Sequence, residues 1–171
     1  MKYTLIITLL ILSVFTFNLK HFFTYKELRV VEVGVNHLDV NGGVEGGIED
    51  IIRLSLDKTT DKLSFSPFSK NNLNVDYLDK SGKAHCWGYA AYNNAVITKL
   101  LKNNNNKDYI VYQSRAKVYL FGFDLHQFFT NKGLVDHDIS VILNKKTGSK
   151  IYVDPSLSEV FGTILSYTTG K

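Results

Sequence analysis

The chain has 171 residues, with 20 Lys and Arg against 16 Asp and Glu and a net charge of +4 at pH 7. This length corresponds to one domain, and without Lys2 and Lys20 only 18 basic residues face 16 acidic ones, which excludes a nucleic-acid-binding footprint. The single cysteine excludes an intramolecular disulfide, and no Cys and His residues have metal-ligand spacing, so we expect neither a metal nor another cofactor.

Residues 3–19 form an almost uncharged apolar stretch between Lys2 and Lys20. These 17 residues are at the lower limit for a membrane-spanning helix and slightly above the usual signal-peptide core. The exit from this stretch lacks the small-x-small triplet of a cleavage site. We therefore expect residues 1–24 to be an uncleaved anchor in the cell membrane, with a domain of residues 25–171 outside the cytoplasm. Secretion after signal cleavage is the alternative, and a buried N-terminal helix is the least favoured interpretation.

Short regular elements and turns follow the apolar stretch. The run 29–35 is rich in valine and predicts a strand or an extended arm, and the glycines within 42–47 then break the chain. Apolar residues recur at helical spacing over 48–59, which predicts an amphipathic helix. Residues 59–83 are polar and rich in turn-forming residues, so we expect mainly a loop there.

The second half of the chain has the pattern of a helix followed by a β-sheet. A helix is predicted over 86–101, and the four asparagines at 103–106 end it because their side chains compete for backbone hydrogen bonds. Strands are predicted over 109–112 and 116–121, where β-branched and aromatic residues are frequent, and the pattern continues over 134–143.

A hairpin closes this predicted sheet. Residues 145–148 form its turn, with Gly148 suited to a left-handed backbone conformation, and a returning strand covers 150–154. Helices followed by antiparallel strands in one chain predict an α+β fold.

Cys86 lies where a polar loop leads into the predicted helix. Backbone N–H groups at a helix N-terminus carry partial positive charge, which favours the nucleophilic thiolate. A cysteine nucleophile needs a base and an orienting carboxylate, and His137 and Asp154 fit these roles in order along the chain. They are 17 residues apart with the turn near the middle, so antiparallel pairing places them near the same end of two adjacent strands. Alternative bases are His37 and His126, although neither has a partner strand that ends in Asp.

This pattern resembles the transglutaminase-like superfamily, whose papain-like α+β fold includes bacterial secreted or surface cysteine peptidases. The resemblance covers roughly residues 45–160: Cys86 begins a central helix, His137 begins a strand, and Asp154-Pro155-Ser156 ends the next strand. It implies a central helix carrying the Cys, packed on an antiparallel sheet carrying His and Asp. Two features depart from the family: Ile139 stands where an aromatic residue is common, and His137 is flanked by Asp136 and Asp138, which would raise its basicity if they approach it. The calcium-site pattern of animal transglutaminases is missing, so metal activation is not implied.

An enzyme of this kind also needs donors for the oxyanion of its tetrahedral intermediate. We expect the main-chain N–H of Cys86 to be one donor. Papain-like enzymes imply an upstream side-chain donor as well, but no Gln precedes Cys86, so the choice stays open. Its candidates are Asn71, Asn72, Asn74 and His85. Trp87 either lines the substrate groove or packs in the core at the start of the helix.

The triad and the resemblance together predict a cysteine acyl-transfer enzyme. Hydrolysis of peptide or isopeptide bonds through a thioester on Cys86 is the leading function, and its substrate is a protein or a peptide. A cell-wall peptide is a more specific hypothesis for the substrate, supported only by the leader. Amine transfer, as in protein-crosslinking transglutaminases, is one alternative. The other is a catalytically idle domain that binds a peptide or a partner protein in the same groove.

Overall fold

The computed structural model describes residues 23–31, 38, 40, 44–67, 69–70, 72–128, 135–161 and 167–170. The expected leader, residues 3–19, therefore lies outside the described residues, as do residues 32–35 of the first expected strand and His37. Within the described ranges, no helix combines the length and the apolar character needed to cross a bilayer.

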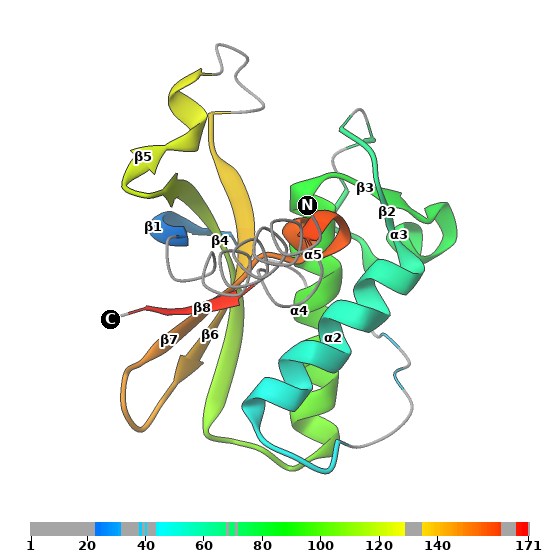
Figure 1. Ribbon diagram of the computed structural model, residues 1–171. Helices are drawn as coiled ribbons and strands as arrows, with labels where there is room; N and C mark the ends of the chain where they lie inside the picture. The colour runs from blue at the N-terminus through cyan, green and yellow to red at the C-terminus, as the bar shows by residue number, and fades with distance from the viewer. Residues whose placement is uncertain are drawn as a thin grey trace, which may run out of the picture.

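An antiparallel sheet forms one side of the molecule (Figure 1). Its main strands, in spatial order, are β1 (Phe23–Val31), β4 (Tyr109–Leu120), β6 (His137–Asn144), β7 (Lys150–Val153) and β8 (Tyr167–Gly170). The short strand β5 (Phe123–Asp124) pairs with the end of β4, and the 3₁₀ helix η2 (Leu125–Phe128) follows it.

Helices cover one face of this sheet (Figure 1). The long helix α4 (Cys86–Asn103) packs against β4 and β6, and α2 (Ile48–Lys62) packs along α4. The short helices α3 (Val75–Ser81) and α5 (Pro155–Phe161) also contact α4. The strands β2 (Ser64–Phe65) and β3 (Lys83–Ala84) form a small parallel pair that leads into α4. The fold is α+β with an antiparallel sheet, as the sequence predicted.

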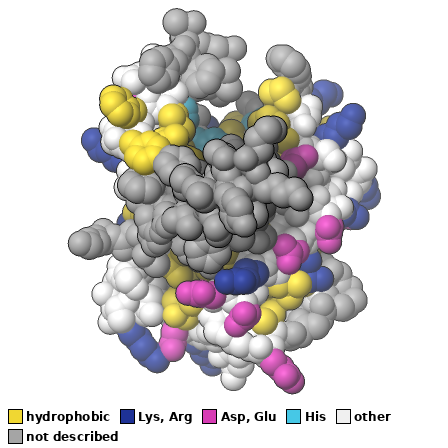
Figure 2. Space-filling view, viewed as in Figure 1, with side chains coloured by type: hydrophobic (Ala, Val, Ile, Leu, Met, Phe, Trp, Pro, Cys, Tyr) yellow, Lys and Arg dark blue, Asp and Glu magenta, His cyan; other side chains and the backbone are white. Residues whose placement is uncertain are grey.

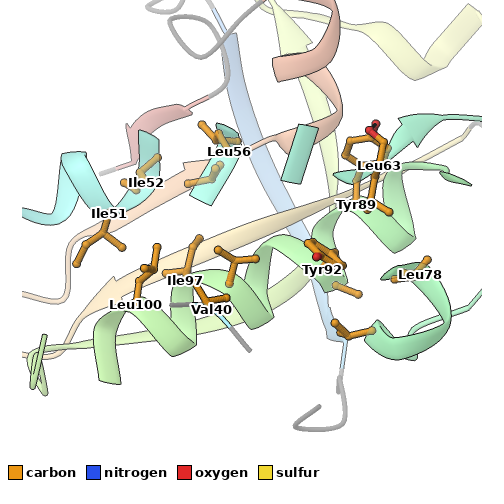
Figure 3. Close-up of a cluster of buried hydrophobic side chains, with 14 of the residues drawn as sticks. Val40, Ile51, Ile52, Leu56, Leu63, Leu78, Tyr89, Tyr92, Ile97 and Leu100 are labelled. Carbon is orange, nitrogen blue, oxygen red and sulfur yellow. Dashed lines mark hydrogen bonds between the residues drawn. The ribbon is translucent and has the colours of Figure 1, made fainter. Parts of the chain in front are cut away.

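The main hydrophobic core lies between the two long helices and the sheet. Ile51, Ile52 and Leu56 of α2 are at most 1% exposed and lie close to Ile97 and Leu100 of α4 (Figure 3). Burial of this much apolar surface, at about 25 cal/mol per Å², is the main force that holds α4 against the rest of the domain. The core therefore fixes the helix whose first residue is Cys86.

One buried polar chain crosses this core from helix to helix to sheet. Thr59 Oγ1 of α2 donates to Asn93 Oδ1 of α4 over 3.2 Å, and Asn93 Nδ2 donates to Ser140 Oγ of β6 over 3.2 Å. All three residues are fully buried, so these bonds satisfy groups that water cannot reach.

Two helices and the hairpin are confirmed. The helices predicted over 48–59 and 86–101 are α2 and α4, each extended by two or three residues at its C-terminal end. The turn after β6 has Gly148 at φ +72°, and β6 and β7 pair antiparallel with Ser140 opposite Val153.

Three predictions about elements were wrong in part. Residues 109–112 and 116–120 belong to one strand, β4, in which the intervening Gln113 and Ser114 are buried, and Phe121 lies in the turn after it. The expected loop 59–83 contains α3, which Asn74 caps by accepting the Tyr77 N–H over 3.0 Å. The first strand begins at Phe23 and not at Arg29, since residues 23–27 also pair with β4.

Candidate active site

Cys86 is the first residue of α4, and the preceding His85 caps the helix. The Nδ1 atom of His85 accepts the Trp87 N–H over 3.2 Å, in the place usually taken by a Ser or Asp oxygen. The thiol therefore lies at the positive end of an 18-residue helix dipole, as the sequence predicted.

His137 begins β6, and Asp154 directly follows β7, so the hairpin brings them together. The Nε2 atom of His137 lies 2.8 Å from Oδ2 of Asp154. The Asp154 side chain is 1% exposed and that of His137 is 19% exposed. Because Asp154 occupies Nε2, the Nδ1 atom is the nitrogen left for the thiol of Cys86, with which His137 forms a hydrogen bond.

Asp154 is held by four neighbouring groups. Its Oδ1 accepts the hydroxyl of Ser156 over 2.8 Å and the main-chain N–H of Leu157 over 3.2 Å. Its Oδ2 is shared between His137 and the hydroxyl of Tyr25, which lies 3.4 Å away. Every partner is a hydrogen-bond donor, so this carboxylate stays ionised while buried.

The electrostatics of the three residues favour an ion pair between thiolate and imidazolium. Burial alone would raise the pKa of Cys86, but hydrogen bonds from His137 and His85, the charge of His137 and the main-chain N–H of Asp138 together lower it to about 6. Burial alone would lower the pKa of His137, but the Asp154 carboxylate and then Cys86 raise it well above its usual value. Both shifts favour the state in which the proton is on His137 and the negative charge is on the Cys86 sulfur.

A pocket of about 240 Å³ opens onto these groups. Its polar wall contains Cys86, His126, Asp136, His137 and Asp154. The rest of the described wall is apolar and consists of Phe23, Phe65, Val118, Leu125 and Leu157. Figure 2 shows histidine atoms inside a hollow at one end of the molecule, with hydrophobic side chains on both sides.

His126, one of the alternative bases, lies in the same pocket. Its ring centroid is 6.2 Å from that of His137, and its Nδ1 accepts the Val118 N–H over 3.4 Å. Burial, together with the charge of His137, lowers the pKa of His126. His126 therefore lines the pocket beside His137. Its own carboxylate neighbour, Asp124 at 3.4 Å, is 23% exposed, whereas Asp154 beside His137 is 1% exposed.

The candidate oxyanion donors are placed differently from one another. The Oδ1 atoms of Asn72 and Asn74 accept the N–H groups of Asn74 and Tyr77, and neither residue is part of the described pocket wall. Asn71 lies outside the described residues. His85 hydrogen-bonds the thiol, so among the candidates it is the side chain that the structure brings to Cys86.

Trp87 does not belong to the described pocket wall. The guanidinium carbon of Arg115 lies 5.5 Å from the centre of its ring, and its main-chain oxygen accepts a hydrogen bond from Gln113 over 3.3 Å. Trp87 is half-buried and packs on Arg115 at the start of the helix, and both interpretations of its role stay predictions.

No family model, curated protein or solved structure matches this chain. Among the described residues, no three His, Cys, Asp or Glu side chains are grouped so that they could hold a metal ion. The chemistry of the site therefore follows from its own geometry.

Several residues that complete the site had no signal in the sequence. Tyr25, Phe23 and Leu157 come from segments whose position beside the triad depends on tertiary packing. Ser156 is different, because its oxygen lies 3.2 Å from Nε2 of His137, and its place in Asp154-Pro155-Ser156 was visible in the sequence.

Proposed function

We propose that the chain is a cysteine acyl-transfer enzyme of the transglutaminase-like type, with a papain-like fold. The observation that carries the proposal is the arrangement of Cys86, His137 and Asp154 around a pocket, with 2.8 Å between His137 and Asp154 and an acidic thiol at a helix N-terminus. An acid–base and nucleophile set of this geometry, with shifted pKa values, is typical of a catalytic centre.

The reaction proceeds in two balanced steps. The Cys86 thiolate attacks the substrate carbonyl, a carbon–sulfur bond forms, and the carbon–nitrogen bond breaks while the amine leaves with the proton held by His137. Water then attacks the thioester and His137 takes its proton. The carbon–sulfur bond breaks, the carboxylic acid leaves, and the pair of Cys86 thiolate and His137 imidazolium is restored. The main-chain N–H of Cys86, which has no acceptor inside α4, is the donor that we assign to the developing oxyanion, since the next N–H, of Trp87, is donated to His85.

The lining of the pocket favours a substrate whose acyl group is apolar. Five apolar side chains form half of its described wall. The two carboxylates in the wall already have cationic partners, since Asp154 pairs with His137 and Asp136 lies 3.6 Å from Arg115. A peptide or isopeptide bond next to an apolar residue therefore fits the pocket better than one next to a charged residue.

Alkylation of the thiol tests this proposal, because a mass increase from iodoacetamide on a chain with one cysteine reports Cys86 alone. At pH 6 to 7 we expect the full chain to react far faster than a free thiol, since a thiol with pKa about 6 is about half thiolate at pH 6 and mostly thiolate at pH 7. His137→Ala should slow alkylation, and both His137→Ala and Cys86→Ala should abolish peptide hydrolysis. A Cys86 that reacts no faster than a free thiol would contradict the proposal and favour an idle binding domain.

Hydrolysis and amine transfer share the thioester and differ only in what resolves it. Incubation of the enzyme with a glutamine-containing peptide and a labelled primary amine separates them. Free carboxylic acid as the product supports hydrolysis, and incorporation of the amine supports transfer.

Cell-membrane anchoring through residues 3–19 belongs to the same proposal. With this anchor, the proposed reaction takes place outside the cytoplasm.

A further inference from the structure

A second set of buried polar side chains lies directly beside the triad, between α4 and the sheet. Gln113 and Arg115 of β4 point toward α4, and Asp138 of β6 lies opposite Arg115 in the sheet register. Gln113 and Asp138 are 1% and 3% exposed. The proposed chemistry uses neither the Gln113 amide nor the Asp138 carboxylate, so their burial needs another explanation.

The main chain of Asp138 is in contact with the nucleophile. Its N–H forms a hydrogen bond to the Cys86 sulfur and favours the thiolate. The register explains why this contact is possible: Ser140 pairs with Val153, so residue 155 would lie opposite Asp138 if β7 continued. Residue 155 is Pro155, which has no N–H and starts α5, and the ladder ends before it reaches Asp138.

Gln113 connects this strand residue to the start of α4. Its Nε2 donates to Oδ1 of Asp138 over 3.1 Å and to the main-chain oxygen of Trp87 over 3.3 Å. Both partners are acceptors, so the amide nitrogen and not the amide oxygen must face them. Trp87 follows Cys86, and Asp138 follows His137, so a single amide ties together the neighbours of the two reacting residues.

Arg115 also contacts Asp138 and Trp87, the residues that follow His137 and Cys86. Its Nη2 lies 3.4 Å from Oδ2 of Asp138, its Nε lies 3.6 Å from Oδ1 of Asp136, and its guanidinium lies over the Trp87 ring. The carboxylates on both sides of His137 are thus directed to Arg115, and Asp154 is the carboxylate that raises the pKa of His137. Arg115 fixes the strand segment around His137 from outside the triad.

Stability alone does not explain the network of Gln113, Arg115, Trp87 and Asp138. Within the described part of the chain, Gln113 Oε1 and Trp87 Nε1 are buried without a hydrogen-bond partner, and each such atom costs about 1–3 kcal/mol. The same two elements, α4 and β6, are already joined by Asn93 and Ser140, at a point about two helical turns along α4 from Cys86. The value of the Gln113 network therefore lies in the geometry at the first turn of α4.

We infer that Gln113 and Arg115 are positioning residues that fix Cys86 against His137 by holding the neighbour of each, Trp87 and Asp138. The inference rests on the proposed function, because it concerns the alignment of the same nucleophile and base. Its consequence is specific: loss of the Gln113 bridge moves the Asp138 N–H away from the sulfur and weakens the thiolate, while the triad residues themselves stay unchanged.

The experiment measures the rate of iodoacetamide alkylation of Cys86 against pH in the full chain, followed by intact mass. Gln113→Met removes the amide donor without a change in charge or much change in volume. It leaves in place the titratable groups around the sulfur, which are His85, His126, His137, Asp136, Asp138 and Asp154. We expect the apparent pKa of the thiol to rise by about one unit and alkylation at pH 6 to slow by about five- to tenfold. Gln113→Asn keeps the amide on a shorter side chain and should fall between Gln113→Met and the native chain.

Ser140→Ala is the matched control, since it removes a buried hydrogen bond between the same two elements at a distance from Cys86. It should lower the melting temperature and leave the pH profile of alkylation unchanged. An unchanged profile in folded Gln113→Met and Gln113→Asn would overturn the inference while the proposed function stands. A native thiol with an ordinary pKa would overturn both.

Discussion

Asp154 shows how one side chain can serve the fold and the site together. Its Oδ1 accepts the N–H of Leu157 in the first turn of α5, which is the bond made by a helix N-cap, and its Oδ2 contacts His137. Pro155 suits the first helical position because the N–H that it lacks would have no acceptor there. The sequence Asp154-Pro155-Ser156 therefore ends β7, starts α5 and orients the histidine in three consecutive residues.

Asp154→Asn tests the charge at this position. The amide oxygen should keep the place of Oδ1, because Leu157 N–H and the Ser156 hydroxyl both donate to it. The amide nitrogen then faces Nε2 of His137 and favours the tautomer with its proton on Nδ1, which cannot accept a proton from the thiol. We expect hydrolysis to fall by about two to four orders of magnitude in a folded protein. A loss of less than about threefold would mark Asp154 as a helix cap without a catalytic role.

The pH profile follows from the directions of the two pKa shifts. The pKa of Cys86 is lowered to about 6, so alkylation should be slow at pH 5 and rise with a midpoint near 6. The raised pKa of His137 keeps its proton available for the leaving amine above its usual range, so hydrolysis should decline only at higher pH. Rates of alkylation and hydrolysis measured across this range check the profile. A midpoint for alkylation near about 8.5 would show an ordinary thiol.

The three proposed catalytic residues could be located from sequence because local features place them. A helix start fixes Cys86, and a short hairpin fixes the spacing of His137 and Asp154. Gln113 could not be found in this way, because its partners Trp87 and Asp138 are 26 and 25 residues away along the chain. In the sequence, a polar residue such as Gln113 looks like the end of a strand, because its buried partner is not visible there.

At the scale of elements, the errors in the predicted helices and strands have a similar cause, because contacts with other parts of the chain set the ends of these elements. The long helices α2 and α4 have repeating apolar faces, which sequence periodicity detects. The helix α3 has only seven residues, and its ends are set by the Asn74 cap and by Gly82 at φ +62°. The N-terminal end of β1 follows an apolar run, so the sequence alone does not separate strand from leader. Antiparallel pairing with β4 defines that end in the structure.

Gly88→Ala tests how tightly the first turn of α4 is packed. An added Cβ would lie 2.8 Å from Cβ of Ala84 and 3.0 Å from Cδ2 of Leu78, so the turn must shift. Alanine usually stabilises a helix interior by about 1 kcal/mol relative to glycine, but overpacking costs about 1–3 kcal/mol. We expect a net loss of stability in urea denaturation and slower alkylation of Cys86.

Gly47→Ser is the control for this substitution, because nothing lies within 4 Å of an added Cβ at that position and serine is a good N-cap for α2. It should leave stability unchanged or slightly higher, with alkylation unaffected. Equal stability of Gly88→Ala and the native chain would mean that the contact between α3 and α4 is looser than these distances indicate.

At the scale of the whole molecule, packing and not covalent cross-linking holds the site together. The single cysteine is free, so the domain has no disulfide, and the core around α2 and α4 supplies the stability. The pocket lies where β1, β2, β4, β6, η2 and α5 meet the N-terminus of α4. Elements from both ends of the described chain thus contribute to one site, and displacement of any of them is expected to change it.

The expected anchor should hold the full chain in the membrane fraction. Carbonate should not release it, because insertion of about seventeen mostly apolar residues is far stronger than the hold of one acyl chain. Membrane fractionation followed by intact mass measures both the location and the processing. Recovery of a shorter, freely soluble form from cells that make the full chain would show a cleaved signal.

Truncation near the N-terminus separates this expected anchor from the proposed catalytic domain. The predicted boundary at residue 24 cuts into β1, since Phe23 pairs with Leu120 and lines the pocket. Deletion of residues 1–22 should therefore release a protein from membranes that keeps rapid alkylation of Cys86. Deletion of residues 1–24 also removes Phe23, and we expect weaker binding of apolar substrates, seen as a raised KM. Equal KM values for the two deletions would show that Phe23 does not contact the acyl group, and this comparison holds whether the leader is cleaved or retained.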